Sequence, residues 1–334
     1  MELSKVKNSD SKKSNDLIFI RNIKANLNQT LQDLQNKIWL ETPELTRENL
    51  KAQYEFQKEI LIKAGLLKKI STGELGIEAI DKQEYPIPTL EQIEERMLEK
   101  RELLETKIPQ GFVKLIIVPF GLPISSLIDA YSNALMENYQ QGKLLDTQGK
   151  LLELDGYVGG RFIDNEDTKY YIQAEATGEL VYFPKEFSDD HQGKTKQELL
   201  PTQAWQVLLL EDLPNLPFKG KGKTIANRQQ PESDQTPDEY LKQLQTDPQY
   251  KGEQGLTPES WLVYGLSHLE QTNQVIDNSQ GLGKSCNLLN SCFVKPVGVP
   301  YAYFYRSHAR VELDENEPTY SSPRKSVRFA VSIF

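Results

Sequence analysis

Two long apolar runs constrain the fold of this chain more than any other feature. GFVKLIIVPFG at residues 111–121 is almost unbroken in apolar residues, and AWQVLLLEDL at residues 204–213 has the same character. A strand with one wet face alternates apolar and polar residues, whereas a continuous apolar run is typical of a strand buried on both faces. The two runs therefore predict buried strands, and the stretch at residues 125–141 predicts a helix.

Further helices are predicted by apolar spacing and by caps. Apolar residues step by three or four through residues 23–38, as in an amphipathic helix. Thr89 and Gln92 match a capping box, in which each side chain satisfies a backbone N–H of the other, and they predict a charged helix to about Thr106. Three more helices are predicted at residues 46–65, 236–245 and 257–276. The last two begin with a threonine, a proline and an acidic residue, which suit a helix cap and first turn.

The middle of the chain has shorter patterns. Between residues 144 and 187 the β-prone pieces GGRF, KYYIQA and GELVYF alternate with turn residues and predict antiparallel strands. Residues 218–235 are polar and rich in lysine, glycine and glutamine, which predicts a flexible loop. Residues 1–15 contain almost no apolar side chains and predict a disordered tail.

Charge and hydropathy exclude several kinds of partner. The 334 residues carry a net charge of −9, which repels nucleic-acid backbones and anionic membranes. Neither a signal peptide nor a run long enough to span a bilayer is apparent, so a cytoplasmic protein is expected.

Cys286 and Cys292 are the only cysteines. They are expected to be buried thiols, with a disulfide as the alternative, and two ligands alone cannot complete a tetrahedral zinc site.

NSQGLGKS at residues 278–285 matches part of a phosphate-binding loop. Gly283, Lys284 and Ser285 fit the end of the pattern G-x-x-x-x-G-K-[ST], but Asn278 stands where the first glycine belongs. Such a loop follows a strand, whereas a helix is predicted before this one, and too few residues follow Ser285 to complete a parallel sheet. Neither nucleotide binding nor any cofactor is expected.

The last part of the chain has the composition of a recognition surface. Between the short anchors VPYA and VRFAV, residues 303–326 are rich in tyrosine, arginine, serine and acidic residues. Tyrosine offers a large contact area at small entropic cost, arginine adds charge and stacking, and small polar residues add adaptable hydrogen bonds. VRFAVSIF predicts a terminal strand. The structural alternative is a polar hairpin loop over an aromatic core.

Three motifs connect this region to a known family: LTPESW at residues 256–261, VPYAYFYR at residues 299–306 and SVRFAV at residues 326–331. They resemble the C-terminal region of variable proteins diversified by retroelements, which use a C-type-lectin fold of the formylglycine-generating-enzyme type. Ser326 stands where that family has glycine. The whole chain also resembles large uncharacterised proteins of candidate-phylum bacteria that carry this C-terminus, a similarity that implies no activity.

The resemblance implies an α+β fold. A helical and mixed α/β region at residues 16–200 would precede a C-type-lectin-like variable domain at residues 201–334. The first and last strands of that fold pair, with two helices beside them, and its later loops vary without loss of core contacts. Val327, Phe329 and Val331 would then point inward, and Arg328 would point the other way.

The function implied is the display of a diversified, non-enzymatic binding surface for another macromolecule, in the first instance a protein. Adenine-directed diversification of asparagine codons yields neither glutamate nor lysine, so Glu312 and Lys325 fit this origin less well. Leu313 is expected to pack beneath the surface. The predicted ligand-binding residues are Tyr303, Tyr305, Arg306, Ser307, His308, Asp314, Asn316, Tyr320 and Ser322.

A metal-dependent enzyme or metal-binding protein is the competing class. Asp189, Asp190 and His191 are adjacent and could bind a metal or act as acid and base. Acidic loops are usually solvated turns, and the other histidines, His268 and His308, lie in no metal-ligand motif. Neither catalytic residues nor a resident metal are therefore expected. A purely structural scaffold is the third alternative.

Overall fold

The computed structural model describes residues 44–152, 165–200, 202–279, 283–305 and 310–334, with scattered positions between 21 and 30. The chain divides into two compact units, Met1–Leu50 and Lys51–Phe334. In the first unit the described positions between 21 and 30 are helical, as the apolar spacing predicts. The tail predicted at residues 1–15 lies outside the described residues.

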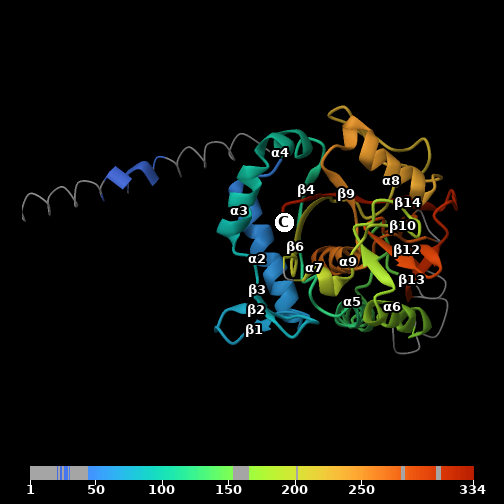
Figure 1. Cartoon of the computed structure of the whole chain (residues 1–334), viewed down its shortest axis with the longest axis horizontal. Helices are drawn as coiled ribbons and strands as arrows, with labels where there is room; N and C mark the ends of the chain where they lie inside the picture. Colours follow the sequence, from blue (N-terminus) through green and yellow to red (C-terminus); the bar gives the residue numbers. More distant parts are fainter. Residues whose placement is uncertain are drawn as a thin grey trace, which may run out of the picture. The chain divides into compact units, whose positions relative to one another are not determined.

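The two apolar runs are confirmed as buried strands of one antiparallel sheet. Its order is β4-β6-β15-β9, so β6 and β15 lie in its interior (Figure 1). Residues 115–118 and 207–210 are each at most 1% exposed. The sheet comprises β4 (Phe112–Val118), β6 (Gln206–Glu211), β9 (Glu253–Gly255) and β15 (Phe329–Ser332). Because β4 pairs with β6, the predicted division at residues 200 and 201 runs through this sheet.

A second sheet carries the C-terminal region. Its order is β14-β10-β12-β11-β5, and β13 also pairs with β12. Only the pairing of β10 with β14 is parallel among these described strands. The strands are β5 (Leu180–Tyr182), β10 (Ser285–Asn287), β11 (Ser291–Val294), β12 (Val297–Tyr305), β13 (Arg310–Asn316) and β14 (Lys325–Val327).

Helices α5 (Ile124–Gln140) and α9 (Pro258–Thr272) pack against each other and connect the sheets. Helix α9 contacts β4 of the first sheet and β12 of the second, and it lies between them in Figure 1. Thr257 caps α9 through a reciprocal hydrogen-bond pair with Ser260. The helix ends at Thr272, before the predicted residue 276, because Asn273 adopts a left-handed conformation.

The other helices follow their predicted caps with one interruption. Helix α2 (Arg47–Lys63) is confirmed, and α8 (Pro237–Thr246) has the capping box of Thr236 and Glu239. The capping box of Thr89 and Gln92 is also confirmed, but the helix it opens is split at Lys100 into α3 (Leu90–Glu99) and α4 (Arg101–Lys107). The short elements are α7 (Lys196–Leu199), η1 (Pro248–Tyr250), β1 (Lys68–Lys69), β2 (Leu75–Glu78), β3 (Glu84–Pro86), β7 (Thr224–Ile225) and β8 (Arg228–Gln229).

The strand predicted at KYYIQA is wrong, because this sequence lies in helix α6 (Asn165–Thr177). Its buried side chains include Thr168, Tyr171 and Ala174, which recur every three residues, a helical spacing, and the Tyr171 ring lies 5.0 Å from that of Phe293. Packing across the helix therefore outweighs the β-propensity of the sequence. The strand predicted at GELVYF is confirmed as β5, and GGRF lies outside the described residues.

The loop predicted at residues 218–235 is irregular apart from one short hairpin, but it is held to the core. It contains the β7–β8 hairpin, and Arg228 within it is fully buried. The Arg228 guanidinium pairs with Glu211 and lies 2.7 Å from a carboxylate oxygen of Glu253. Acidic residues that are distant in sequence therefore hold residues 218–235 in place, although the composition of this stretch is typical of a loop. Among the described helices none is long and apolar enough to cross a membrane.

Candidate binding surface on β12 and β13

Strand alternation divides β12 and β13 into two faces. Tyr301, Tyr303 and Tyr305 lie opposite Asp314, Glu312 and Arg310 in the antiparallel register. Successive side chains of a strand point to opposite faces, so these six residues share one face. The intervening residues, which point into the core, are Ala302, Phe304, Val311 and Leu313, and each is 0% exposed. Leu313 is thus confirmed as a packing residue.

The three tyrosines form a continuous row. The rings of Tyr301 and Tyr303 are stacked with centroids 5.9 Å apart, and those of Tyr303 and Tyr305 meet edge to face at 5.7 Å. The Tyr301 hydroxyl donates to Asp314 Oδ2 at 2.6 Å, and the Tyr303 hydroxyl donates to Glu312. Burial and these carboxylates raise the pKa of both phenols. The cross-strand acids therefore hold the rings in place. We call these six paired residues the tyrosine face.

A lysine from β14 completes one end of the tyrosine face. Lys325 Nζ lies 3.3 Å from the Tyr301 ring centroid and 5.1 Å from that of Tyr320, and it donates to Asn316 Oδ1. Burial lowers the pKa of Lys325 to about 8. The ammonium group is stabilised by the aromatic rings instead of by water. Tyr320 is 50% exposed, so it offers ring surface to a ligand.

Arg310 and Glu312 bind each other at the other end. Arg310 Nε donates to Glu312 Oε1 at 2.9 Å, and Nη2 lies 2.8 Å from the same oxygen. Glu312 is 9% exposed and also accepts from Tyr303. This carboxylate therefore joins an arginine and a tyrosine on neighbouring strands.

The structure brings several predicted site residues together. Tyr303, Tyr305, Asp314 and Asn316 lie on β12 and β13, and Tyr320 lies next to Lys325. Ser322 has a turn role, because its Oγ accepts the N–H of Arg324 at 3.2 Å. Arg306, Ser307 and His308, which connect the two strands in sequence, lie outside the described residues.

Sequence reasoning missed four contributors, which are Tyr301, Arg310, Glu312 and Lys325. Tyr301 could have been found, because it continues the alternate spacing of the other two tyrosines. Glu312 and Lys325 were left out of the predicted site because diversified asparagine codons yield neither glutamate nor lysine. Both nevertheless hold tyrosine rings in position. Their role depends on strand register, which the local sequence does not reveal.

Arg328, predicted to point the other way from Val327, Phe329 and Val331, lies in a buried environment. It is 5% exposed and lies between β14 and β15, where the chain passes from one sheet to the other. Its Nη2 lies 2.6 Å from Asp277 Oδ1, and its guanidinium lies over the Tyr264 ring. Trp261 Nε1 donates to the same carboxylate at 2.8 Å. The strand crossing is therefore fixed by a buried ion pair.

The other candidate sites have simpler structures. Ser285 opens strand β10, whereas a phosphate-binding loop precedes a helix. Cys286 and Cys292 are free and buried, as predicted, and burial raises the pKa of both thiols. Asp189 and Asp190 are exposed, and His191 Nδ1 accepts the N–H of Gly193 at 2.9 Å. Within the described ranges no three His, Cys, Asp or Glu side chains are placed to hold a metal ion.

Comparison with known proteins gave no match: no protein-family model, curated protein sequence or solved structure is similar to this chain.

Proposed function

We propose that the protein uses its tyrosine face, together with Tyr320, as a non-enzymatic binding surface for another macromolecule, in the first instance a protein. The observation that carries this proposal is the alternation of residues 301–305 and 310–314 between two faces. Ala302, Phe304, Val311 and Leu313 are fully buried, whereas the three tyrosines form a partly exposed row of aromatic rings. Outward residues can therefore change without loss of core packing.

A C-type-lectin-like domain is part of the proposal. In support, the terminal strand β15 pairs with β6 and β9, and α5 and α9 pack together beside the sheet. Since β4 belongs to the same sheet, such a domain would begin before Phe112 rather than at residue 201.

The chemistry of the surface suits protein recognition. Tyrosine rings supply apolar area with a hydrogen-bonding tip, and binding energy concentrates in a few aromatic or arginine residues. In a diversified protein, Glu312 and Lys325 would be constant residues that position the rings, and the tyrosines and the segment at residues 306–309 would vary. Neighbouring DNA should then hold a near-copy of the 3′ coding segment that differs mainly at adenines, beside a reverse transcriptase gene.

A pair of display libraries tests the surface itself. One library randomises Tyr303, Tyr305, Asp314 and Tyr320; the matched library randomises the inward residues Ala302, Phe304, Val311 and Leu313. We expect most clones of the first library to fold and to yield binders to a model protein such as lysozyme, and most clones of the second to be unfolded. Equal folding in both libraries, or no binders from the first, would contradict the proposal. With a native partner, truncation of Tyr305 should cost about 2 kcal/mol of binding free energy.

A further inference from the structure

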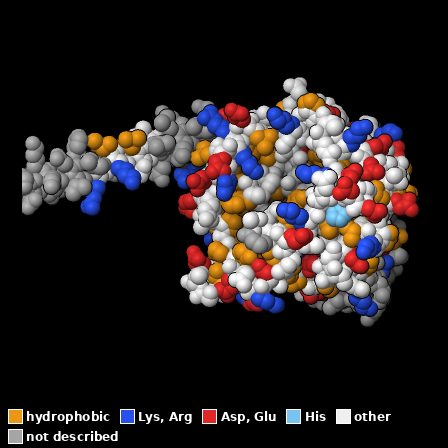
Figure 2. Space-filling view, in the orientation of Figure 1, with side chains coloured by type: hydrophobic (Ala, Val, Ile, Leu, Met, Phe, Trp, Pro, Cys, Tyr) orange, Lys and Arg blue, Asp and Glu red, His pale blue; other side chains and the backbone are white. Residues whose placement is uncertain are grey.

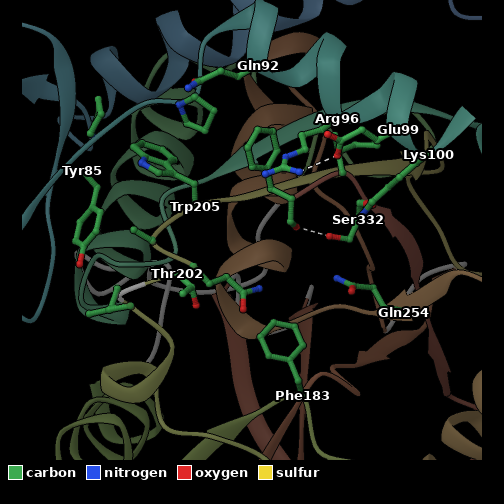
Figure 3. A pocket seen from close by; sticks show the side chains of 17 residues that line it. Tyr85, Gln92, Arg96, Glu99, Lys100, Phe183, Thr202, Trp205, Gln254 and Ser332 are labelled. Carbon is green, nitrogen blue, oxygen red and sulfur yellow. Dashed lines mark hydrogen bonds and ion pairs between the residues drawn. The ribbon is translucent and has the colours of Figure 1, made fainter.

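A pocket of about 680 Å³ lies apart from the residues of the tyrosine face. Its walls come from β3 and the turn after it, from α3 and Lys100, from the segment that precedes β6, and from residues 332–334 (Figure 3). Hydrophobic side chains gather near the C-terminus in the space-filling view of the same unit (Figure 2). The volume lies within the range of small-molecule sites, roughly 300–1,000 Å³.

One side of the pocket is aromatic and the other is polar. Figure 3 shows Tyr85 and Trp205 on one side, with Lys100 and Gln254 opposite them. Phe183 lies at the lower end of this view. A flat apolar group fits against the aromatic side, and polar atoms of a ligand would then face the opposite wall.

Hydrogen-bond donors in this pocket exceed acidic acceptors. Lys100 is half-buried, and its Nζ donates at 2.8 Å to the main-chain oxygen of Ser332, a neutral acceptor. Burial, and secondly the charge of Arg96, lower the pKa of Lys100. A half-buried cation whose acceptor is neutral favours a ligand with negatively charged oxygens.

The acidic side chain that lines the pocket does not neutralise its two cations, Lys100 and Arg96. Glu99 is the only acidic side chain among the described residues that line the pocket. It already pairs with Arg96 at 2.7 Å, and both side chains are about half exposed. An exposed ion pair of this kind is weak, so Arg96 can turn to an incoming anion. The main-chain oxygen of Phe334 is also occupied, because it accepts from Ser332 Oγ.

We propose that this pocket binds a small organic anion with a planar apolar body, of the class of aromatic carboxylates and sulfonates. The apolar body lies against Tyr85 and Trp205, and the anionic oxygens bind Lys100 and Arg96. This site is independent of the tyrosine face and of the function proposed for it.

Two fluorescent probes of matched shape test the proposal. The anionic probe is 8-anilinonaphthalene-1-sulfonate, and N-phenyl-1-naphthylamine has the same rings without the sulfonate. Titration of the folded full chain should give one site with about tenfold higher affinity for the anionic probe, because the sulfonate accepts charge-assisted hydrogen bonds that the neutral probe cannot form. Equal affinity for both probes, or no binding of the anionic one, would overturn the proposal.

Charge-removing variants locate the site. Arg96→Gln and Lys100→Met should each lower affinity for the anionic probe severalfold and leave affinity for the neutral probe unchanged. The matched control is Arg101→Gln, since Arg101 forms a similar exposed pair with Glu105 but does not line the pocket. Thermal unfolding checks that each variant folds, and an equal loss in Arg101→Gln would reject the site.

Discussion

Arg328 and Asp277 form a buried, two-point ion pair. Arg328 Nη2 lies 2.6 Å from Asp277 Oδ1, and Arg328 Nε donates to Oδ2 at 3.0 Å. The aspartate follows α9, and the arginine lies between strands of different sheets. Since Trp261 also donates to this carboxylate, one side chain links a helix to the crossing between the two sheets.

Removing the charge of Asp277 should destabilise the fold strongly. Asp277→Asn leaves the guanidinium of Arg328 buried without a counter-charge, which costs about 3–5 kcal/mol. Urea unfolding followed by circular dichroism measures this loss. The control is Asp234→Asn in the exposed pair of Lys219 and Asp234, where the loss should stay below about 1 kcal/mol. Equal losses of unfolding free energy in both variants would contradict a larger stabilising contribution of the buried pair.

The predicted C-terminal domain should not fold as residues 201–334 alone. That fragment lacks β4, so β6 loses a partner strand and the buried side chains of both strands lose their contacts. Residues 51–334 should unfold as cooperatively as the full chain, because they form one compact unit. Near-ultraviolet circular dichroism during urea unfolding distinguishes the fragments. A cooperative transition of residues 201–334 would restore the boundary at residue 201.

Lys325 should make stability rise with pH in the alkaline range. Its pKa is lowered by burial from 10.5 to about 8, so between these values the unfolded chain binds more protons than the folded one. The free energy of unfolding therefore increases with pH in that window, and below about pH 8 this lysine no longer changes it, because both states are then protonated.

A comparison of Lys325→Met with the unchanged chain measures the contribution of Lys325 to this pH dependence. Lys325→Met should have a smaller rise in stability between pH 8 and pH 10 than the unchanged chain, because the titrating group is gone. Lys51→Met, at an exposed lysine of α2, is the control and should keep the original slope. A Lys325→Met variant with the original slope, or a steeper one, would contradict the assignment.

The acidic loop at Asp189 and Asp190 should bind no metal stoichiometrically. Both side chains are exposed, and His191 Nδ1 already accepts a backbone N–H from Gly193. Inductively coupled plasma mass spectrometry of the purified protein and of His191→Ala should therefore find the same low metal content. Stoichiometric metal that disappears in His191→Ala would instead support the metal-dependent alternative.

Residues of the candidate surface could be predicted where their positions depend on the local sequence alone. Alternation places Tyr303 and Tyr305 on one face of a strand, because the backbone period is two residues. The positions of Glu312 and Lys325 depend on which residues of other strands lie opposite, and composition does not encode that register. The sequence also favoured a strand at KYYIQA, where the packing of Tyr171 and Ala174 stabilises a helix.

Several elements can be predicted from the residues that form them. Continuous apolar runs specify β4 and β6, and reciprocal caps specify where α3, α8 and α9 begin, because these effects act within a few residues. The positions at which a charge can be buried depend instead on contacts between segments that are distant in sequence. Arg228 lies in a predicted loop and Arg328 in a predicted strand, and the carboxylates of Glu253 and Asp277, distant in sequence, neutralise them. A charge can leave water only where the fold supplies its partner, and that partner is set by the arrangement of the sheets.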